Sequence, residues 1–128
     1  MAEIRVSARC FPTEDRDKVI GAIRNLFPDF SAEGDDPVTG SASSMERFAE
    51  LLKRQRIRSA ARAALRRGIQ ADRVAFALNK QVAAAGKVSF SEDTHALGDL
   101  EVSIITSNPD RVIDEVAPRS EAGAGEGR

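Results

Sequence analysis

Hydrophobic and polar residues alternate in two segments, one near each end of the chain. Every second residue of segment 3–10 is apolar, and the same pattern runs through LEVSIIT at residues 100–106. A period of two is typical of a strand with one buried face. The stretch DFSAEGDDPVTGSA has turn-forming residues between short alternating flanks, which predicts a hairpin. Segments 74–78 and 88–90 predict two further strands.

A first helix is expected after the first strand. Thr13 can cap its N-terminus, and Glu14, Asp15 and Asp17 then fall in its first turn, where carboxylates complement the unpaired N–H groups and the helix dipole. Apolar residues at helical spacing continue to Phe27, and the proline that follows ends the helix.

Residues 44–67 carry two apolar stripes that do not share one helical face. Ser43 and Glu46 have capping-box spacing, which places a helix start at about residue 44. At 100° per residue, the apolar face rotates by roughly 140° between Leu52 in the first stripe and Ile57 in the second. We therefore expect a break or sharp bend within residues 55–59.

Further helix ends are marked by their usual residues. Ser59 can cap the piece after the break, and Gly68 is suited to a left-handed residue that ends it. Asn79 and Gly86 delimit a short helix, and Asn108 followed by proline opens a last one. The mixture of strands and helices predicts one α+β domain with a mainly antiparallel sheet over residues 1–118.

Composition narrows the class of protein. The chain has 128 residues, 41% of them apolar, with six Phe and neither Trp nor Tyr. No apolar run is long enough for a membrane span, and the N-terminus lacks the pattern of a signal peptide, so we expect a cytoplasmic protein. One cysteine and one histidine exclude a Cys/His zinc site within the chain, and we expect neither metal nor cofactor. The tail 119–128 has no apolar anchors and is expected to be disordered.

Charge is distributed unevenly along the chain. Residues 44–90 hold 11 basic and 3 acidic residues, a net charge of +8, whereas the whole chain has a formal charge of -1. Such asymmetry favours an anionic partner on one side of the molecule. The candidate RNA-binding residues are Lys53, Arg54, Gln55, Arg56, Arg58, Arg62, Arg66, Arg67, Asn79, Lys80 and Gln81.

The basic run at residues 51–67 has two interpretations. It is either a solvated helix surface whose arginines pair with carboxylates elsewhere, or a face that binds phosphates. Its six arginines against one lysine favour bidentate recognition of phosphate or carboxylate. All six Phe occupy positions typical of core or turns, so binding should depend on backbone and shape. The NKQ at residues 79–81 is either an ordinary cap or a second anion site.

The blocks FPTEDRDKV, NLFP, LLKRQRIRSAAR, LNKQ, GKVSF and LGDLEVSI follow one another along nearly the whole chain before the tail. In order and spacing they resemble the signature blocks of an archaeal family of uncharacterised conserved proteins. The resemblance implies an α+β fold similar to the large-subunit ribosomal protein that contacts the 5S RNA, and a relationship to proteins proposed as exosome-associated. It implies no activity. Ala96 departs from the pattern, in which proline is expected before LG.

Three classes of function remain open. The first is a non-enzymatic protein that binds RNA or belongs to a ribonucleoprotein. The second is an adaptor that uses the same arginines, or the acidic N-terminal third, against a protein partner. The third is a magnesium-dependent hydrolase with Glu14, Asp15 and Asp17 as ligands. We identify no catalytic residue, because no phosphate loop or paired nucleophile and base accompanies these carboxylates, and His95 is expected in an exposed loop.

Overall fold

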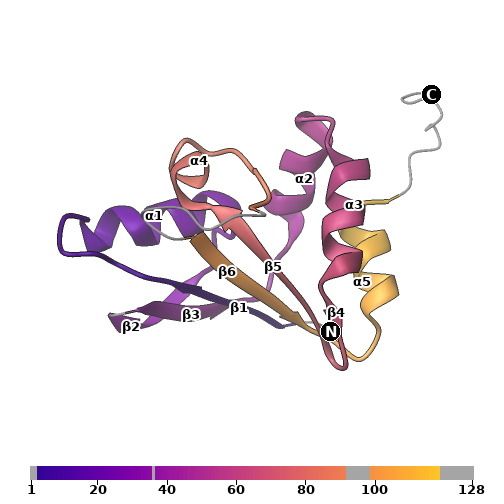
Figure 1. The fold of residues 1–128 in the computed structure, drawn as a ribbon, viewed down its shortest axis with the longest axis horizontal. Coiled ribbons are helices and arrows are strands. Elements are labelled where there is room, and N and C mark those ends of the chain that lie inside the picture. Colours follow the sequence, from indigo (N-terminus) through magenta and orange to yellow (C-terminus); the bar gives the residue numbers. More distant parts are fainter. Residues whose placement is uncertain (1–2, 36, 92–98, 119–128) are drawn as a thin grey trace.

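The computed structural model describes residues 3–35, 37–91 and 99–118, and in these residues the chain forms one antiparallel sheet with helices on one side (Figure 1). The strands are β1 (Glu3–Ala8), β2 (Ser31–Asp35), β3 (Val38–Ala42), β4 (Ile69–Gln70), β5 (Arg73–Asn79) and β6 (Asp99–Ile105). The helices are α1 (Arg16–Leu26), α2 (Glu46–Arg54), α3 (Arg58–Arg67), α4 (Lys80–Ala84) and α5 (Pro109–Val116). The predicted α+β class is confirmed. His95, Ala96 and the tail 119–128 lie outside the described residues.

The strand order is β2-β3-β1-β6-β5-β4, so the first strand of the chain lies inside the sheet. The alternation predicted for β1 is present, with Ile4 and Val6 buried. Ile4 pairs with Ala42 on one side and Ile104 on the other, and both partners are also buried. Matching registers therefore bring the apolar residues of neighbouring strands onto one continuous face.

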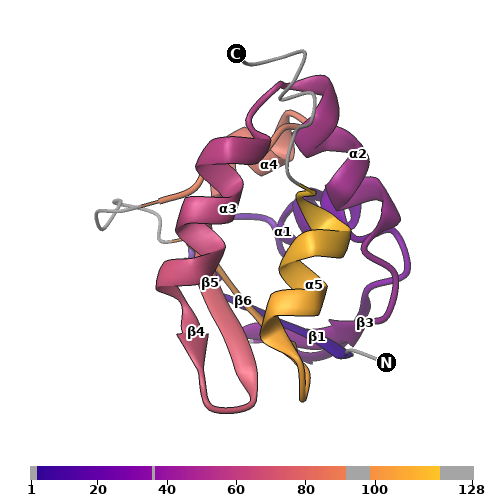
Figure 2. The same ribbon diagram turned by 90° about the vertical axis from the view of Figure 1, so that its right-hand side faces the viewer.

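The helices cover that apolar face. Figure 1 shows α1, α2 and α4 above the sheet, and Figure 2 shows α3 and α5 side by side. Between helices and sheet, three phenyl rings form a stacked column. The Phe27 and Phe48 ring centroids are 5.4 Å apart, and Phe76 follows at 5.8 Å from Phe48. Phe27 and Phe48 are fully buried, whereas Phe76 is half-buried, so the column runs from the core to the surface.

The strand predictions are confirmed where the alternation is long enough. The β2–β3 hairpin is present, with an irregularity in register between Ala32 and Gly34. Segment 88–90 makes only a single bridge, between Phe90 and Leu78, instead of a strand. The two-residue strand β4 was not predicted, because two residues are too few to show a period.

Three of the predicted caps are wrong. Asp15, and not Thr13, caps α1 by accepting from the N–H of Asp17. Ser43 donates its N–H and hydroxyl to Asp29 at 3.0 and 2.7 Å, so it makes no capping box. Helix α3 begins after Ile57 without any side-chain cap, which removes the role expected of residue 59. Asp15 thus takes the role predicted for Thr13, and Asp29 binds the Ser43 side chain that was predicted to cap α2.

The other helix ends follow their sequence signals more closely. Asn79 and Asn108 cap α4 and α5 as predicted, and Gly86 has a φ of +81° after α4. Gly68 is not left-handed, since its φ is -94°. It is needed for space, because a Cβ there would clash with the carbonyl oxygen of Ala75.

Candidate functional site

The basic run is interrupted where the sequence predicts a break. Helix α2 ends at Arg54 and α3 begins at Arg58. Between them, the N–H of Arg56 donates to the carbonyl of Lys53 and that of Ile57 to the carbonyl of Leu52, each at 3.1 Å. This pair of bonds is a Schellman motif, with Arg56 at the position that usually holds glycine. The two apolar stripes therefore belong to two helices, as predicted.

Arg56 is held in an unfavourable backbone conformation. Its φ is +58°, and among the described residues it is the one non-glycine with positive φ. A left-handed residue with a side chain costs roughly 1–2 kcal/mol relative to the right-handed conformation. Strain of this kind concentrates at functional sites. The side chain of Arg56 is exposed at the turn, so the strain places a guanidinium group in solvent.

Gln55 fixes the turn to a distant part of the chain. Its side-chain amide donates to the carbonyl of Val88 at 2.9 Å and accepts from the N–H of the same residue at 2.8 Å. Both polar atoms of Gln55 are thus occupied within the protein. The clamp also brings Lys87, the exposed residue before Val88, beside the turn. Nothing in the sequence pattern shows this proximity, since 33 residues separate the two partners.

The turn therefore carries a group of basic side chains, which we call the elbow cluster. Its members are Lys53, Arg54, Arg56, Arg58 and Lys87. Glu50 pairs with Arg54 at 3.0 Å, yet the Arg54 side chain remains 67% exposed. Glu50 also lies 3.7 Å from Arg47. One carboxylate therefore serves two arginines at the edge of the cluster, and the charge of Arg54 is only partly compensated.

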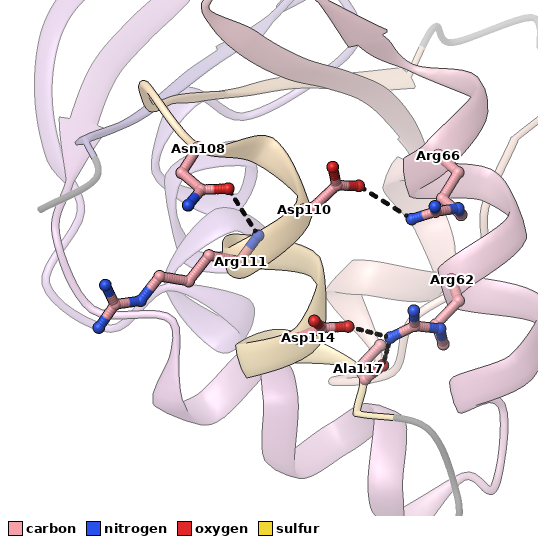
Figure 3. A network of polar contacts seen from close by, with 7 residues as sticks. All are labelled: Arg62, Arg66, Asn108, Asp110, Arg111, Asp114 and Ala117. Atoms are coloured by element: carbon pink, nitrogen blue, oxygen red, sulfur yellow. Dashed lines mark hydrogen bonds and ion pairs between the residues drawn. The ribbon is translucent and has the colours of Figure 1, made fainter.

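Two other arginines of the run join α3 to α5 (Figure 3). Arg62 Nη1 lies 2.8 Å from Asp114 Oδ1 and 2.8 Å from the carbonyl oxygen of Ala117, and its side chain is only 13% exposed. Arg66 Nη1 lies 3.1 Å from Asp110 Oδ1. The solvated-surface interpretation is thus correct in part, since these arginines pair with carboxylates. The last arginine, Arg67, lines a hollow at the other end of α3.

The NKQ segment is built into the fold. Lys80 is 4% exposed, and its Nζ donates to the carbonyl oxygen of Arg9 and to both carboxylate oxygens of Glu14, at 2.8 to 3.1 Å. Asn79 caps α4, and Gln81 is exposed. All three protons of the Lys80 ammonium group therefore have acceptors within the chain.

Glu14 does not belong to the first turn of α1, contrary to expectation, because it precedes the Asp15 cap. Burial alone would raise the pKa of its carboxyl. The hydrogen bond from Lys80, that from the N–H of Phe11 and the charge of Lys80 together hold the pKa below its ordinary value. Across the described residues, no group of three or more His, Cys, Asp or Glu side chains could hold a metal ion.

Comparison with known proteins places this surface in a family context. The family model described as RNA binding matches residues 3–107. A UPF0201 protein of Sulfolobus acidocaldarius is 39% identical over an alignment of 134 positions, which covers 96% of this chain and 92% of the relative. A UPF0200/UPF0201 protein of Archaeoglobus fulgidus is 38% identical over 94% of this chain, but this match spans only 39% of the relative.

Solved structures agree with the sequence matches. The crystal structure of a UPF0201 protein from Methanococcus jannaschii has a TM-score of 0.85 and 35% identity, and the match covers 95% of this chain and 97% of that one. A second UPF0201 crystal structure has a TM-score of 0.83 at 36% identity. The archaeal resemblance in the sequence blocks is therefore confirmed. No helix among the described residues is long and apolar enough to cross a membrane.

Proposed function

Since the chain belongs to the UPF0201 family and matches the RNA-binding family model over most of its length, we propose that it binds RNA through phosphate groups received at the elbow cluster. The left-handed conformation of Arg56 is the observation that carries this proposal. Glycine would relieve the strain at this position. An arginine at this strained position is explained if its exposed side chain binds a ligand.

The chemistry of the cluster supports phosphate as its ligand. Guanidinium groups form bidentate, charge-assisted hydrogen bonds with phosphate oxygens. The cluster lies at the turn where the separate helices α2 and α3 meet, a shape suited to irregular or single-stranded RNA. Glu50, the carboxylate beside Arg54, is shared with Arg47. A polyanion would add the negative charge that this shared carboxylate does not supply.

The hydrogen bonds and ion pairs narrow the set of residues proposed from the sequence. Arg62 and Arg66 hold α5, Gln55 holds Val88, and Lys80 holds Glu14. We assign these four to the framework and the phosphate contacts to the elbow cluster. The similarity to the ribosomal protein that contacts the 5S RNA stays a prediction from the sequence.

The test is the salt dependence of RNA affinity. Lys53, Arg54 and Arg56 are changed together to Gln, which removes the three positive charges and has a helix propensity similar to that of Lys and Arg. For single-stranded RNA, the logarithmic slope of affinity against salt falls by about 0.7 for each phosphate that the protein no longer neutralises. The slope of the triple variant should therefore be flatter than that of the wild type by roughly 2.

The matched control changes Lys18, Arg73 and Arg111 to Gln, three exposed or partly exposed cations on α1, β5 and α5. This variant has the same net charge and should retain the wild-type slope. No salt-dependent affinity of the wild type for RNA, or equal slopes for the two variants, would refute the proposal. An acidic protein that binds through the same cations would then favour the adaptor. Magnesium-dependent RNA cleavage would favour the hydrolase.

A further inference from the structure

A hollow of about 450 Å³ lies at the C-terminal end of α3. The side chains of Arg67, Phe76 and Phe90 line it, together with Ala64 of α3 and Ala75 of β5. Its volume falls within the range of sites for small ligands. Ala64 is the small residue that α3 contributes to the lining.

The aromatic lining is the end of the stacked column in the core. Phe76 stacks on buried Phe48 with an angle of 20° between the ring planes. The Phe90 ring centroid lies 5.8 Å from that of Phe76, with the planes tilted by 55°. Both rings are half-buried. Packing on one side thus fixes the orientation of Phe76, while part of the aromatic surface faces the hollow.

Helix α3 connects this hollow to the elbow cluster. Its ten residues span about 14 Å at 1.5 Å per residue, with the cluster at one end and Arg67 at the other. Figure 2 shows the same path, from the α2–α3 turn at the top of the view down to β4. A short single strand of RNA is long enough to contact both ends.

We propose that the hollow receives an unpaired nucleobase of the RNA whose phosphates lie on the elbow cluster. This inference rests on the proposed function. It adds base stacking to an interaction for which the sequence predicts contacts with the backbone and shape of the RNA alone. Every base has a flat aromatic face that can stack on a phenylalanine ring, so the hollow favours unpaired strands with weak preference for base identity.

The test compares two polymers of equal length, an oligouridine RNA and the same ribose-phosphate strand without bases. Stacking of one base on an aromatic side chain strengthens binding about fivefold to about a hundredfold, so the wild type should bind oligouridine at least about fivefold more tightly. In NMR spectra, ring signals of Phe76 and Phe90 should shift with oligouridine and stay in place with the baseless strand. The aromatic region is sparse, since the chain has no Trp or Tyr.

Ala64→Leu fills the hollow while it keeps every charge and the helix propensity. It should reduce the preference for oligouridine to nearly one and leave the salt slope unchanged. Ala63→Leu, the same change on the exposed side of α3, should retain the preference. Equal wild-type affinity for the two polymers with a normal salt slope would overturn the base site alone, as would an Ala64→Leu variant that keeps the preference. Failure of both polymers to bind would overturn the phosphate proposal as well.

Discussion

At the scale of single residues, Arg56 and Lys80 differ in their surroundings, although both belong to the basic set proposed from the sequence. Arg56 has an exposed side chain on a strained backbone. Lys80 is buried, with three acceptors around its ammonium group. From the sequence alone, both residues are candidate phosphate ligands. Their surroundings separate them, and two predictions follow from that difference.

Arg56→Gly should raise stability and weaken RNA binding. Glycine relieves the left-handed strain of roughly 1–2 kcal/mol but gains entropy in the unfolded chain, so we expect a net stabilisation of about 0.5–1 kcal/mol. Chemical denaturation measures the first effect and RNA titration the second. Lys18→Gly is the control, since glycine inside α1 should destabilise the protein and leave RNA binding unchanged. A loss of stability in Arg56→Gly would show that the arginine serves the fold instead.

Glu14→Gln should lower stability at pH 7 by about 3 kcal/mol, because Lys80 would remain buried and charged without its counter-ion. Because the folded pKa of Glu14 is lowered, its contribution is present above the ordinary value near 4.5 and is lost as pH falls through the folded pKa. The wild type should therefore lose stability below about pH 4.5, and the variant should lose less. Thermal denaturation across pH 2–7 measures both curves.

The double variant Glu14→Gln with Lys80→Met should recover much of the loss at pH 7, since it removes both charges together. If the double variant is no more stable than Glu14→Gln alone, packing around Lys80 matters more than its charge.

At the scale of elements, α3 has different partners on different sides. Arg62 and Arg66, four residues apart, point from one side of the helix to α5 (Figure 3). Ala61 and Leu65 are fully buried and pack into the core. Ala64 and Arg67 line the hollow. A single helix thus docks α5, closes part of the core and borders the proposed base site.

Arg62→Gln should destabilise the protein by about 2 kcal/mol and leave the salt slope of RNA binding unchanged. The change removes a charge-assisted hydrogen bond to Asp114 and one to the Ala117 carbonyl at the end of α5. Calorimetry should show a melting temperature lower by several degrees. Arg66→Gln, whose ion pair is half exposed, should cost less than about 1 kcal/mol. A flatter salt slope in Arg62→Gln would return this arginine to the binding surface.

At the scale of the whole molecule, folding redistributes the charge that the sequence concentrates between residues 44 and 90. Asp110 and Asp114 lie outside that segment, yet they pair with Arg66 and Arg62 inside it. Glu14 likewise pairs with Lys80. These pairs engage Arg62, Arg66 and Lys80 of the segment, whereas Lys53, Arg54 and Arg56 of the elbow cluster stay exposed. Because the cations of the elbow cluster repel one another, an anion that binds them should stabilise the folded protein.

Heparin should raise the melting temperature of the wild type, because a polyanion that binds only the folded protein stabilises it by mass action. At a heparin concentration about one hundred times the dissociation constant, the gain is about 2.7 kcal/mol. The variant with Lys53, Arg54 and Arg56 changed to Gln should gain much less. Differential scanning calorimetry at low ionic strength measures both. Equal gains in the two proteins would place the anion site away from the turn.

The sequence was a good guide where an apolar pattern extends over several residues. The alternation around Ile4 and the misaligned stripes at Leu52 and Ile57 lead directly to β1 and to the break between α2 and α3. A cap prediction was wrong where a distant residue competes, as with Asp29, which binds Ser43 across 14 positions. The pairing of Arg62 with Asp114 spans 52 positions and follows from the packing of α3 on α5. Burial and pairing of charges depend on tertiary contacts that no local pattern records.

The place of β1 within the sheet has a consequence for the order of folding. Strands β1 to β3 come from residues 3–42 and β4 to β6 from residues 69–105, so each half pairs within a short length of chain. Among the described strands, the two halves of the sheet are joined by the pairing of β1 with β6, with Glu3 opposite Ile105. Closing that seam requires the largest loop in the sheet, and long-range pairing of this kind slows folding. During synthesis, one edge of β1 therefore stays unpaired until β6 has left the ribosome, and it is there that we expect a nascent chain to need protection from aggregation.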